Sequence, residues 1–312
     1  MVSGPKKIIM KKIALITGGA GFIGSNLVDE LLNDGHEVIV IDNESADFND
    51  KFYWNEKAHN YKNDICDYHE CSIIFERHKP DVVFHVAAEA RIQPSINNPL
   101  KAIETNVIGT GTILELCKQN NVKRVIYSST SSAYGLKNTP PLNENMPNDC
   151  LNQYSISKTC GEELCKLYYK LYGLETIILR YFNVYGERQP LKGKYAPVVG
   201  LFLRQYKANE PMTIVGDGEQ RRDFTHVSDI VAANILVAKF SGKNYNWGQL
   251  YNVGTGKNYS INEIAKLIGD NTINIPTRPA ESRITLANIE KIKNDFGWKP
   301  KISLENWIVK NI

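Results

Sequence analysis

The stretch KIALITGGAGFIGSNLVDELLN, from Lys12 to Asn33, decides the fold. Lys12 to Thr17 is a short apolar segment that predicts a buried strand, and Ser25 to Asn33 has the apolar periodicity of a helix. Between them stand three glycines with the spacing G-x-x-G-x-x-G: Gly18, Gly21 and Gly24. A strand, a glycine-rich turn and a helix in this order are typical of a dinucleotide-binding unit.

A different physical requirement calls for glycine at each of these three positions. We expect Gly18 to allow the tight turn, Gly21 to let the backbone approach a pyrophosphate, and Gly24 to let the helix pack closely on the strand. Free N–H groups and the helix dipole attract an anion at the start of the helix, where Phe22 and Ile23 lie. The turn therefore predicts the binding of a pyrophosphate.

The next segment indicates which dinucleotide is bound. Glu37 to Ile41 predicts the second strand, and Asp42-Asn43 follows it. Asp42 lies 24 residues after Gly18, where an acidic residue accepts hydrogen bonds from the adenosine ribose. A carboxylate there repels a 2′-phosphate, so we expect NAD rather than NADP. A plain turn residue at the strand end is the alternative for Asp42.

Strand-like and helix-like segments alternate as far as Tyr181, which predicts an α/β fold with a Rossmann-like, doubly wound parallel sheet. His85 stands inside an apolar strand predicted over 81–88, and we expect it to be structural rather than catalytic. A long helix is predicted over 100–120. Ligands bind at the carboxyl ends of parallel strands. Cofactor candidates beyond the glycine turn are Asp42, Asn43, Asp64, Ile65, Ala87, Ala88, Thr105, Asn106, Ser128, Tyr154, Lys158 and Tyr181.

The last third of the chain has a looser pattern and predicts a smaller, mixed lobe over the carboxyl edge of the sheet. We assign residues 10–182, with roughly 226–254, to the NAD-binding domain. Residues 183–225 and 255–312 are assigned to the lobe. Met1 to Ile9 is interpreted as a loose extension.

Composition argues against several classes of function. The net charge of +3 comes without a block of Lys and Arg, so we expect no nucleic acid partner. No apolar run reaches 18 residues, so no membrane-spanning helix is expected. The six cysteines show no Cys-x-x-Cys and no paired metal spacing, which favours reduced thiols in a cytoplasmic protein and no metal site.

Tyr154 and Lys158 lie at the start of a helix predicted over 153–172. They are four residues apart, so they share one helix face, roughly 6 Å apart along the axis. A phenol loses its proton near pH 10, and a neighbouring ammonium lowers that pKa. The pair is therefore a candidate proton-transfer couple, although Tyr and Lys at this spacing also arise by chance.

Four motifs stand in order along the chain: TGGAGFIG (Thr17–Gly24), YSISK (Tyr154–Lys158), LRYFNVYG (Leu179–Gly186) and GDGEQRRDF (Gly216–Phe224). With them the chain resembles the extended short-chain dehydrogenase/reductases and, within these, the UDP-hexose 4-epimerases. The similarity covers about Lys11 to Pro300. It implies a domain that holds NAD and a smaller domain that binds a UDP-sugar.

The resemblance also implies roles for individual side chains. Tyr154 would be the catalytic base, Lys158 would orient the nicotinamide ribose and lower the pKa of Tyr154, and Thr130 would hydrogen-bond the 4-oxygen of the sugar. Arg278 matches an arginine that pairs with the diphosphate. Thr285 matches a position that gates the hexose pocket, and its small size favours UDP-GlcNAc and UDP-GalNAc as well as UDP-Glc and UDP-Gal. The candidate substrate ligands are Thr130, Ser131, Tyr154, Asn183, Arg222, Arg278 and Thr285.

Ser131 and Ser132 stand where the dehydratases and decarboxylases of the family usually carry an acid, which favours epimerisation. The implied reaction transfers a hydride from C4 to NAD⁺, turns the 4-keto sugar and returns the hydride to the opposite face. One alternative is another NAD-dependent nucleotide-sugar enzyme, a 4,6-dehydratase or a UDP-glucuronate decarboxylase or 4-epimerase. The other is a non-catalytic NAD-binding regulator. Glu89 departs from the family pattern, since many relatives have an uncharged residue there.

Two helices of the chain match those that form a four-helix dimer interface in the family. They are predicted over 100–120 and 154–172, so the resemblance implies a homodimer. Tyr168, Tyr169 and Tyr172 give the second helix an aromatic surface, which packing within one chain explains nearly as well.

Overall fold

The structure, a computed structural model, describes residues 12–46, 49–191, 196–242, 245–277 and 282–312. The predicted extension from Met1 to Ile9 and the candidate ligand Arg278 lie outside these ranges. Within them, each helix is too short or too polar to cross a bilayer.

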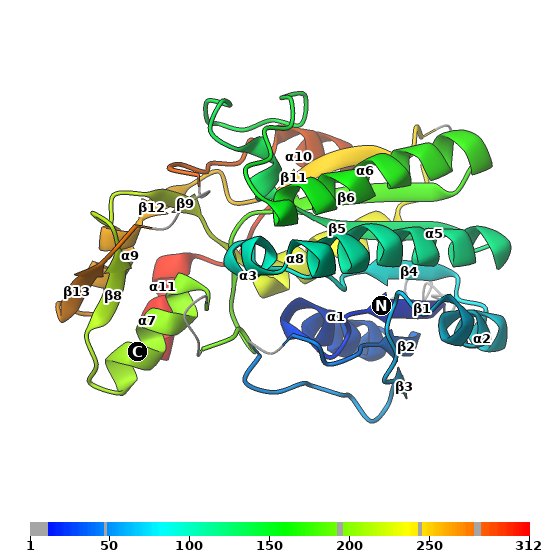
Figure 1. The fold of residues 1–312 in the computed structure, drawn as a ribbon, viewed down its shortest axis with the longest axis horizontal. Helices are drawn as coiled ribbons and strands as arrows, with labels where there is room; N and C mark the ends of the chain where they lie inside the picture. Colours follow the sequence, from blue (N-terminus) through cyan, green and yellow to red (C-terminus); the bar gives the residue numbers. More distant parts are fainter. Residues whose placement is uncertain (1–11, 47–48, 192–195, 243–244, 278–281) are drawn as a thin grey trace, which may run out of the picture.

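In the described ranges the central sheet has seven strands: β1 (Ile13–Thr17), β2 (Glu37–Ile41), β3 (His59–Tyr61), β4 (Val82–His85), β5 (Arg124–Thr130), β6 (Glu175–Tyr181) and β11 (Gln249–Val253). All neighbours are parallel, in the order β11-β6-β5-β4-β1-β2-β3 (Figure 1). The chain builds outward from β1, first through β2 and β3 and then, in the opposite direction, through β4 to β11. The direction changes between β1 and β4, and ligands bind at the carboxyl ends of strands at such a point.

Helices cover both faces of the sheet. One face carries α1 (Phe22–Asn33), α8 (Val227–Lys239) and α10 (Glu290–Phe296), and the other carries α2 (Tyr68–His78), α5 (Gly109–Gln119) and α6 (Gln153–Tyr172). Alternate strand residues supply the two cores: Ile16 packs towards α1, and Leu15 packs towards α2 and α5. Because both faces are buried, the inner strands are mainly apolar, whereas the edge strand β3 is polar and largely exposed. The predicted doubly wound α/β fold is confirmed.

The helix predicted over 100–120 is not a uniform α-helix. It begins as α4 (Pro99–Ile103), passes through the π-helical turn η1 (Glu104–Ile108) and continues as α5. The short helix α3 (Ile92–Asn97) precedes it and lies against α6. A π turn adds one residue to the hydrogen-bonded ring, which changes the face on which each side chain lies.

The C-terminal lobe has a hydrophobic core of its own, which includes Phe202, Ile264 and Ile308. In Figure 1 it lies at one end of the sheet, at the left of the view. Its elements are β7 (Val184–Tyr185), α7 (Val198–Lys207), β8 (Met212–Val215), β9 (Arg221–Asp223), β10 (Thr225–His226), β12 (Asn258–Ser260), α9 (Ile261–Ile268), β13 (Thr272–Ile275) and α11 (Leu304–Asn311). The pairs β7–β10 and β8–β13 are parallel, and β9–β12 is antiparallel. This is the predicted smaller, mixed lobe.

One helix in the second stretch that we assigned to the lobe packs elsewhere. Ile292 of α10 and the following Trp298 are buried in the core of the sheet, and α10 contacts β11. The chain therefore returns to the large domain between β13 and α11.

Candidate active site

A cavity of about 480 Å³ lies where the carboxyl ends of the strands meet the C-terminal lobe. Most of the predicted site residues line it: Gly18, Gly21, Phe22, Ile23, Gly24, Asp42, Asn43, Ile65, Ala87, Ala88, Thr105, Thr130, Ser131, Tyr154, Tyr181, Asn183, Arg222 and Thr285. The other predicted residues that the structure describes are not part of its lining: Asp64, which is exposed, and the buried Asn106, Ser128 and Lys158.

The glycine turn leaves its backbone open to a bound group. Gly18 has a φ of +68°, a conformation that favours glycine. A Cβ atom on Gly24 would lie 2.1 Å from the backbone oxygen of Gly18, so only glycine fits there. No side chain caps the start of α1, whose N-cap is Gly21. The first-turn N–H groups and the helix dipole therefore make a site that fits a pyrophosphate.

Asp42 joins the end of β2 to this turn. Its carboxylate accepts hydrogen bonds from the backbone N–H of Ala20 (3.1 Å) and of Glu44 (2.8 Å). Burial raises the pKa of Asp42, and these two donors partly offset the rise. Next to it, Asn43 donates to the carboxylate of the exposed Asp64 at 2.9 Å.

Tyr154 lies in the first turn of α6. The helix starts with a capping box, in which Asn152 accepts the N–H of Ser155 and the side chain of Ser155 accepts the N–H of Asn152. The net effect on the phenol is a raised pKa, because burial outweighs the lowering by a hydrogen bond with Thr130 and by the charge of Arg91. This direction is opposite to the one expected from Lys158, which does not figure among the causes of the shift.

Lys158 lies beneath the wall, 3% exposed, with its ammonium 4.2 Å from the centre of the Tyr127 ring. Burial lowers the pKa of Lys158 to about 7. The close packing of α6 on this ring depends on Gly161, where a Cβ atom would lie 2.1 Å from the Tyr127 hydroxyl. A lysine with so low a pKa is half neutral near pH 7, which weakens its effect on Tyr154.

Asn106 and Ser128 support the wall from behind. The amide of Asn106 donates to Ser157 (2.9 Å) and to the backbone oxygen of Glu89 (3.1 Å), and its oxygen accepts the N–H of Glu89 (2.8 Å). The hydroxyl of Ser128 pairs with that of Tyr181 at 2.9 Å. Their predicted contacts with the cofactor remain predictions.

His85 is held in a chain of hydrogen bonds below the cavity. Its Nδ1 pairs with the hydroxyl of Thr17 (2.7 Å) and its Nε2 with that of Thr110 (2.9 Å). The Thr17 oxygen also accepts the N–H of Ala87 at 3.2 Å. Burial lowers the pKa of His85 to about 3. The ring is therefore neutral and ties β1, β4 and α5 together, as expected of a structural histidine.

The lobe contributes the far side of the cavity. Asn183 donates to the backbone oxygen of Asp223 (2.8 Å) and to the hydroxyl of Thr285 (3.3 Å). Arg222 donates to the backbone oxygen of Arg283 at 3.1 Å. These contacts fix the three predicted substrate ligands in one wall.

The sequence reasoning missed Arg91, which also lines the cavity. Arg91 is the N-cap of α3, and this helix is tied to α6 because Ser95 accepts the backbone N–H of Tyr154 at 3.1 Å. Burial lowers the pKa of the Arg91 guanidinium to about 10, and the charge of Tyr154 opposes this shift. No spacing signal in the sequence points to this contact, because it joins two separate helices.

A buried ion pair that the sequence reasoning also missed lies behind Ser129. Glu162 accepts two hydrogen bonds from Arg180, at 2.7 and 2.6 Å, and one from Ser129 at 2.5 Å. The Arg180 guanidinium lies over the ring of Tyr134, 4.5 Å from its centre. The pair fixes the end of β5, which carries Thr130.

Comparison with known proteins adds an independent finding. Residues 14–254 match the NAD dependent epimerase/dehydratase family. A UDP-glucuronate 4-epimerase of Thermodesulfobacterium geofontis is 34% identical over 325 residues, and a UDP-glucose 4-epimerase of Mycolicibacterium smegmatis is 33% identical over 309 residues; each match covers 96% of both chains. The crystal structure of the Thermotoga maritima UDP-glucose 4-epimerase with UDP-glucose is similar with a TM-score of 0.89 and 36% identity, over 95% of this chain and 96% of that one.

Proposed function

The chain belongs to the NAD dependent epimerase/dehydratase family, and we propose that it inverts the configuration at C4 of a UDP-hexose. The predicted family, the NAD cofactor and the isomerase class are confirmed by the relatives. The observation that carries the proposal is the composition of one cavity. Tyr154 and Thr130 line it together with the glycine turn of the large domain and with Arg222 and Thr285 of the lobe.

The residues of the cavity fit NAD. Gly18, Gly21 and the start of α1 would hold the pyrophosphate, and Asp42 would accept hydrogen bonds from the adenosine ribose. When bound, NAD supplies a hydride acceptor for C4 and returns the hydride to the sugar. Lys158 lies below the same part of the wall, and we assign it to the nicotinamide ribose.

Proton transfer falls to Tyr154. A sugar hydroxyl is not acidic, so loss of a hydride from C4 requires a base that takes the hydroxyl proton in the same step. Tyr154 takes this proton and later returns it to the 4-oxygen, while Thr130 holds that oxygen by a hydrogen bond. Arg91 favours the phenolate form of Tyr154 through its positive charge.

The scarcity of acidic side chains in the cavity lining supports epimerisation over elimination. Among the described residues that line the cavity, the only carboxylate belongs to Asp42, at the adenosine end. Next to Thr130 stand the neutral Ser131 and Ser132, which are poor acids. Elimination across C5 and C6 needs a further acid near the sugar, whereas inversion at C4 needs no acid or base besides Tyr154.

Thr285 supports the N-acetylhexosamines as substrates besides the plain hexoses. Its side chain is small and fixed, since its hydroxyl accepts hydrogen bonds from Asn183 and from the backbone N–H of Asp223, both at 3.3 Å. A bulkier residue at this place would narrow the pocket. We therefore assign UDP-GlcNAc/UDP-GalNAc and UDP-Glc/UDP-Gal as candidate substrates.

The test is incubation of the purified protein, with NAD added, with UDP-Glc and with UDP-GlcNAc, followed by chromatographic separation of the sugar nucleotides. We expect the 4-epimer of at least one substrate and no release of CO₂. A stable 4-keto-6-deoxy product would indicate a dehydratase instead. Absence of any 4-epimer from these two substrates and from the uronate named below would contradict the proposal.

Arg91 favours a second candidate, the 4-epimerisation of a UDP-hexuronate. A guanidinium matches a carboxylate in charge and in geometry, and Arg91 lies in the wall near Tyr154, the side of the cavity where C4 and its neighbours would lie. UDP-glucuronate therefore belongs in the same assay. Preference for it over UDP-Glc by kcat/KM would select this candidate.

We also propose a homodimer through α4 and α6. Large apolar side chains are exposed on these helices and on η1 between α4 and α5: Leu100, Ile103, Ile108, Ile156, Leu167 and Leu171. Leu100 is 75% exposed and Leu171 is 58% exposed. Several large apolar side chains exposed on neighbouring helices are typical of a protein–protein interface.

A further inference from the structure

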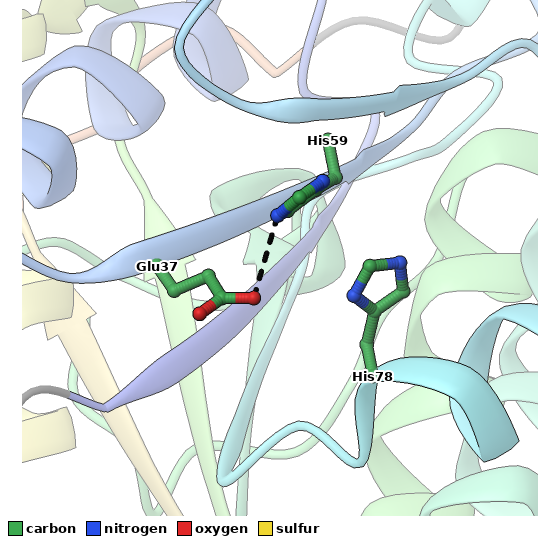
Figure 2. A group of neighbouring side chains, drawn as sticks. All are labelled: Glu37, His59 and His78. Carbon is green, nitrogen blue, oxygen red and sulfur yellow. Dashed lines mark ion pairs between the residues drawn. The ribbon is translucent and has the colours of Figure 1, made fainter.

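Three potential metal ligands converge on the sheet far from the cavity. Glu37 is the first residue of β2, His59 is the first residue of β3, and His78 is the last residue of α2. One ligand atom from each lies within 4.8 Å of the other two (Figure 2). None of the three lines the active-site cavity.

The fold brings these residues together from segments about twenty residues apart in the chain. His59 pairs with Ile39 in the parallel register of β2 and β3, and Glu37 lies on the same face of β2 as Ile39 because it precedes it by two. The helix α2 covers this face with Ile74 and Phe75, which pack in the same core as Ile39. Its last residue, His78, therefore reaches the amino end of the two strands.

The side chains are oriented as ligands. Glu37 and His59 already approach within 3.3 Å through Oε1 and Nε2. His78 uses Nε2 to pair with the hydroxyl of Tyr61 at 2.7 Å, and Figure 2 shows its other ring nitrogen, Nδ1, facing Glu37 and His59. Metal-binding histidines use one ring nitrogen for the metal and the other for a hydrogen bond that fixes the ring.

We propose that Glu37, His59 and His78 form a site for one divalent transition-metal ion of the zinc class. Two imidazoles and a carboxylate suit Zn²⁺, with water as the fourth ligand, better than they suit Mg²⁺ or Ca²⁺. Ligand atoms about 2 Å from a tetrahedral ion lie about 3.4 Å apart. The Glu37–His59 distance of 3.3 Å fits this value. The three ligand atoms lie within 4.8 Å of one another, so metal binding requires only a small movement of the His78 side chain.

The contact of Nε2 with Tyr61 leaves the Nδ1 atom of His78 facing the other two ligands. The residues that would compete for His78 are the exposed Arg77 and the Tyr61 hydroxyl, and Arg77 donates to Tyr61 at 3.4 Å rather than to His78.

The site would stabilise the edge of the sheet. The strand β3 has three residues and, among the residues that the structure describes, only β2 as its neighbour. The backbone oxygen of Tyr61 in β3 accepts the N–H of Asp42 at 3.1 Å. A metal ion that joins β3, β2 and α2 would therefore also hold the segment that carries Asp42.

The experiment uses the full chain without an affinity tag, stripped of metal with a chelator. We expect calorimetric titration with Zn²⁺ to give one equivalent bound, and the thermal midpoint to rise with the Zn²⁺ concentration. Co²⁺ should give the visible absorption of tetrahedral nitrogen and oxygen ligands. His59→Gln and His78→Gln should each abolish binding, and Tyr61→Phe should weaken it by about ten- to a hundredfold because it removes only the hydroxyl that fixes His78.

His69→Gln is the matched control, since His69 lies on the same helix α2 but is exposed and outside the cluster. It should bind Zn²⁺ as the unmodified chain does. The proposal is overturned if the chain takes up no Zn²⁺ at micromolar concentrations. It is also overturned if binding survives in the His59→Gln/His78→Gln double variant, or if the Co²⁺ spectrum shows thiolate ligation. These readouts involve no sugar nucleotide, so they stand apart from the test of the proposed function.

Discussion

The phenol of Tyr154 has to change its protonation state in every catalytic cycle of the proposed reaction. Tyr154→Phe keeps the ring in the cavity wall and removes only the group that carries the proton. We expect kcat to fall by at least about 10²- to 10⁴-fold, the usual contribution of a general base. Sugar-nucleotide turnover measures this effect, and NAD binding, followed by calorimetry, should stay within about twofold of its original value. Unchanged turnover would remove Tyr154 from the mechanism.

Substitution of Arg91 tests whether its charge lowers the pKa of Tyr154. Its charge lowers that pKa against the effect of burial. In Arg91→Met the pKa should rise, so the rising limb of the pH–kcat profile should move to higher pH. Arg91→Lys keeps the charge and should restore part of the original profile.

The outcome also separates the two candidate substrates. If Arg91 binds a substrate carboxylate instead, Arg91→Met should raise KM for UDP-glucuronate selectively and leave the pH profile in place. A variant that alters neither the profile nor this KM would contradict both roles.

Lys158 makes stability depend on pH in a defined direction. Its pKa is about 7 in the folded chain against 10.5 for an ordinary lysine. The unfolded chain therefore binds more protons between these values, and the free energy of unfolding rises with pH across this window. The destabilisation is fully present below pH 7 and absent above about pH 10.5.

Lys158→Met removes the buried ammonium group and with it the destabilisation at low pH. We expect the variant, freed of cofactor, to be more stable than the unmodified chain by an amount on the order of a few kcal/mol at pH 6, with the difference vanishing near pH 10. Urea unfolding at several pH values measures it. A constant difference across the pH range would show that Lys158 is not desolvated in the folded state.

The residues of the glycine turn could be predicted from the sequence because they interact with residues close to them in the chain. Gly18 and Gly24 contact each other within one turn, and Asp42 follows the next strand at a fixed spacing. The surroundings of Lys158 could not be predicted, since the ring of Tyr127 that buries it comes from another strand. The sequence predicted a lowered pKa for Tyr154, whereas the burial of the phenol, which depends on the packing of the whole domain, raises it. Arg91 was missed for the same reason.

At the scale of elements, the predicted strands and helices are correct in type, and the errors lie in local geometry. The pattern over 100–120 predicts one helix, because apolar residues recur at helical spacing on both sides of η1. The π turn itself leaves no sequence signal. It places Thr105 in the cavity wall and turns Asn106 inwards, where its amide is used by Ser157 and Glu89.

The pair of Glu162 and Arg180 joins α6 to β6 without water around it, with both side chains 2% exposed or less. Glu162→Gln leaves the Arg180 charge without a counter-charge in the interior. We expect the free energy of unfolding to fall by about 3–5 kcal/mol, as when one partner of a buried pair is removed. Urea unfolding measures the change.

The neighbouring Glu163 gives the matched control for this prediction. It pairs with Lys166 at 2.6 Å, but its side chain is 64% exposed. Glu163→Gln should change the free energy of unfolding by less than about 0.5 kcal/mol. Equal effects of the two substitutions would mean that the Glu162 pair is not specially important.

At the scale of the whole molecule, the proposed homodimer depends on the apolar surface of α4 and α6. Leu100→Asp combined with Leu171→Asp places two charges on this surface and should convert the dimer into a monomer. Light scattering after size-exclusion chromatography measures the mass. Val309→Asp is the control, because Val309 is 68% exposed on α11 of the lobe. A monomeric mass for the unmodified chain would contradict the dimer.

The division into a large domain and a lobe could be predicted, but the course of the chain between them could be predicted only in part. Placing α10 requires knowing that β11 pairs with β6, which buries Ile292 against the sheet. Nothing local to Glu290–Phe296 distinguishes this helix from α9 or α11. The pairing of distant strands decides where such a helix packs, and the apolar periodicity of the sequence carries no information about that pairing.

The contact between Asp42 and the glycine turn limits how cofactor preference can evolve. A change towards a phosphorylated ribose calls for loss of the Asp42 carboxylate, yet Ala20 and Glu44 both donate their backbone N–H groups to it. An exchange at this one position would thus loosen the glycine turn, which we propose holds the pyrophosphate. A lineage that moves to NADP has to replace an acceptor and add a cation together, so its early intermediates would bind both dinucleotides weakly.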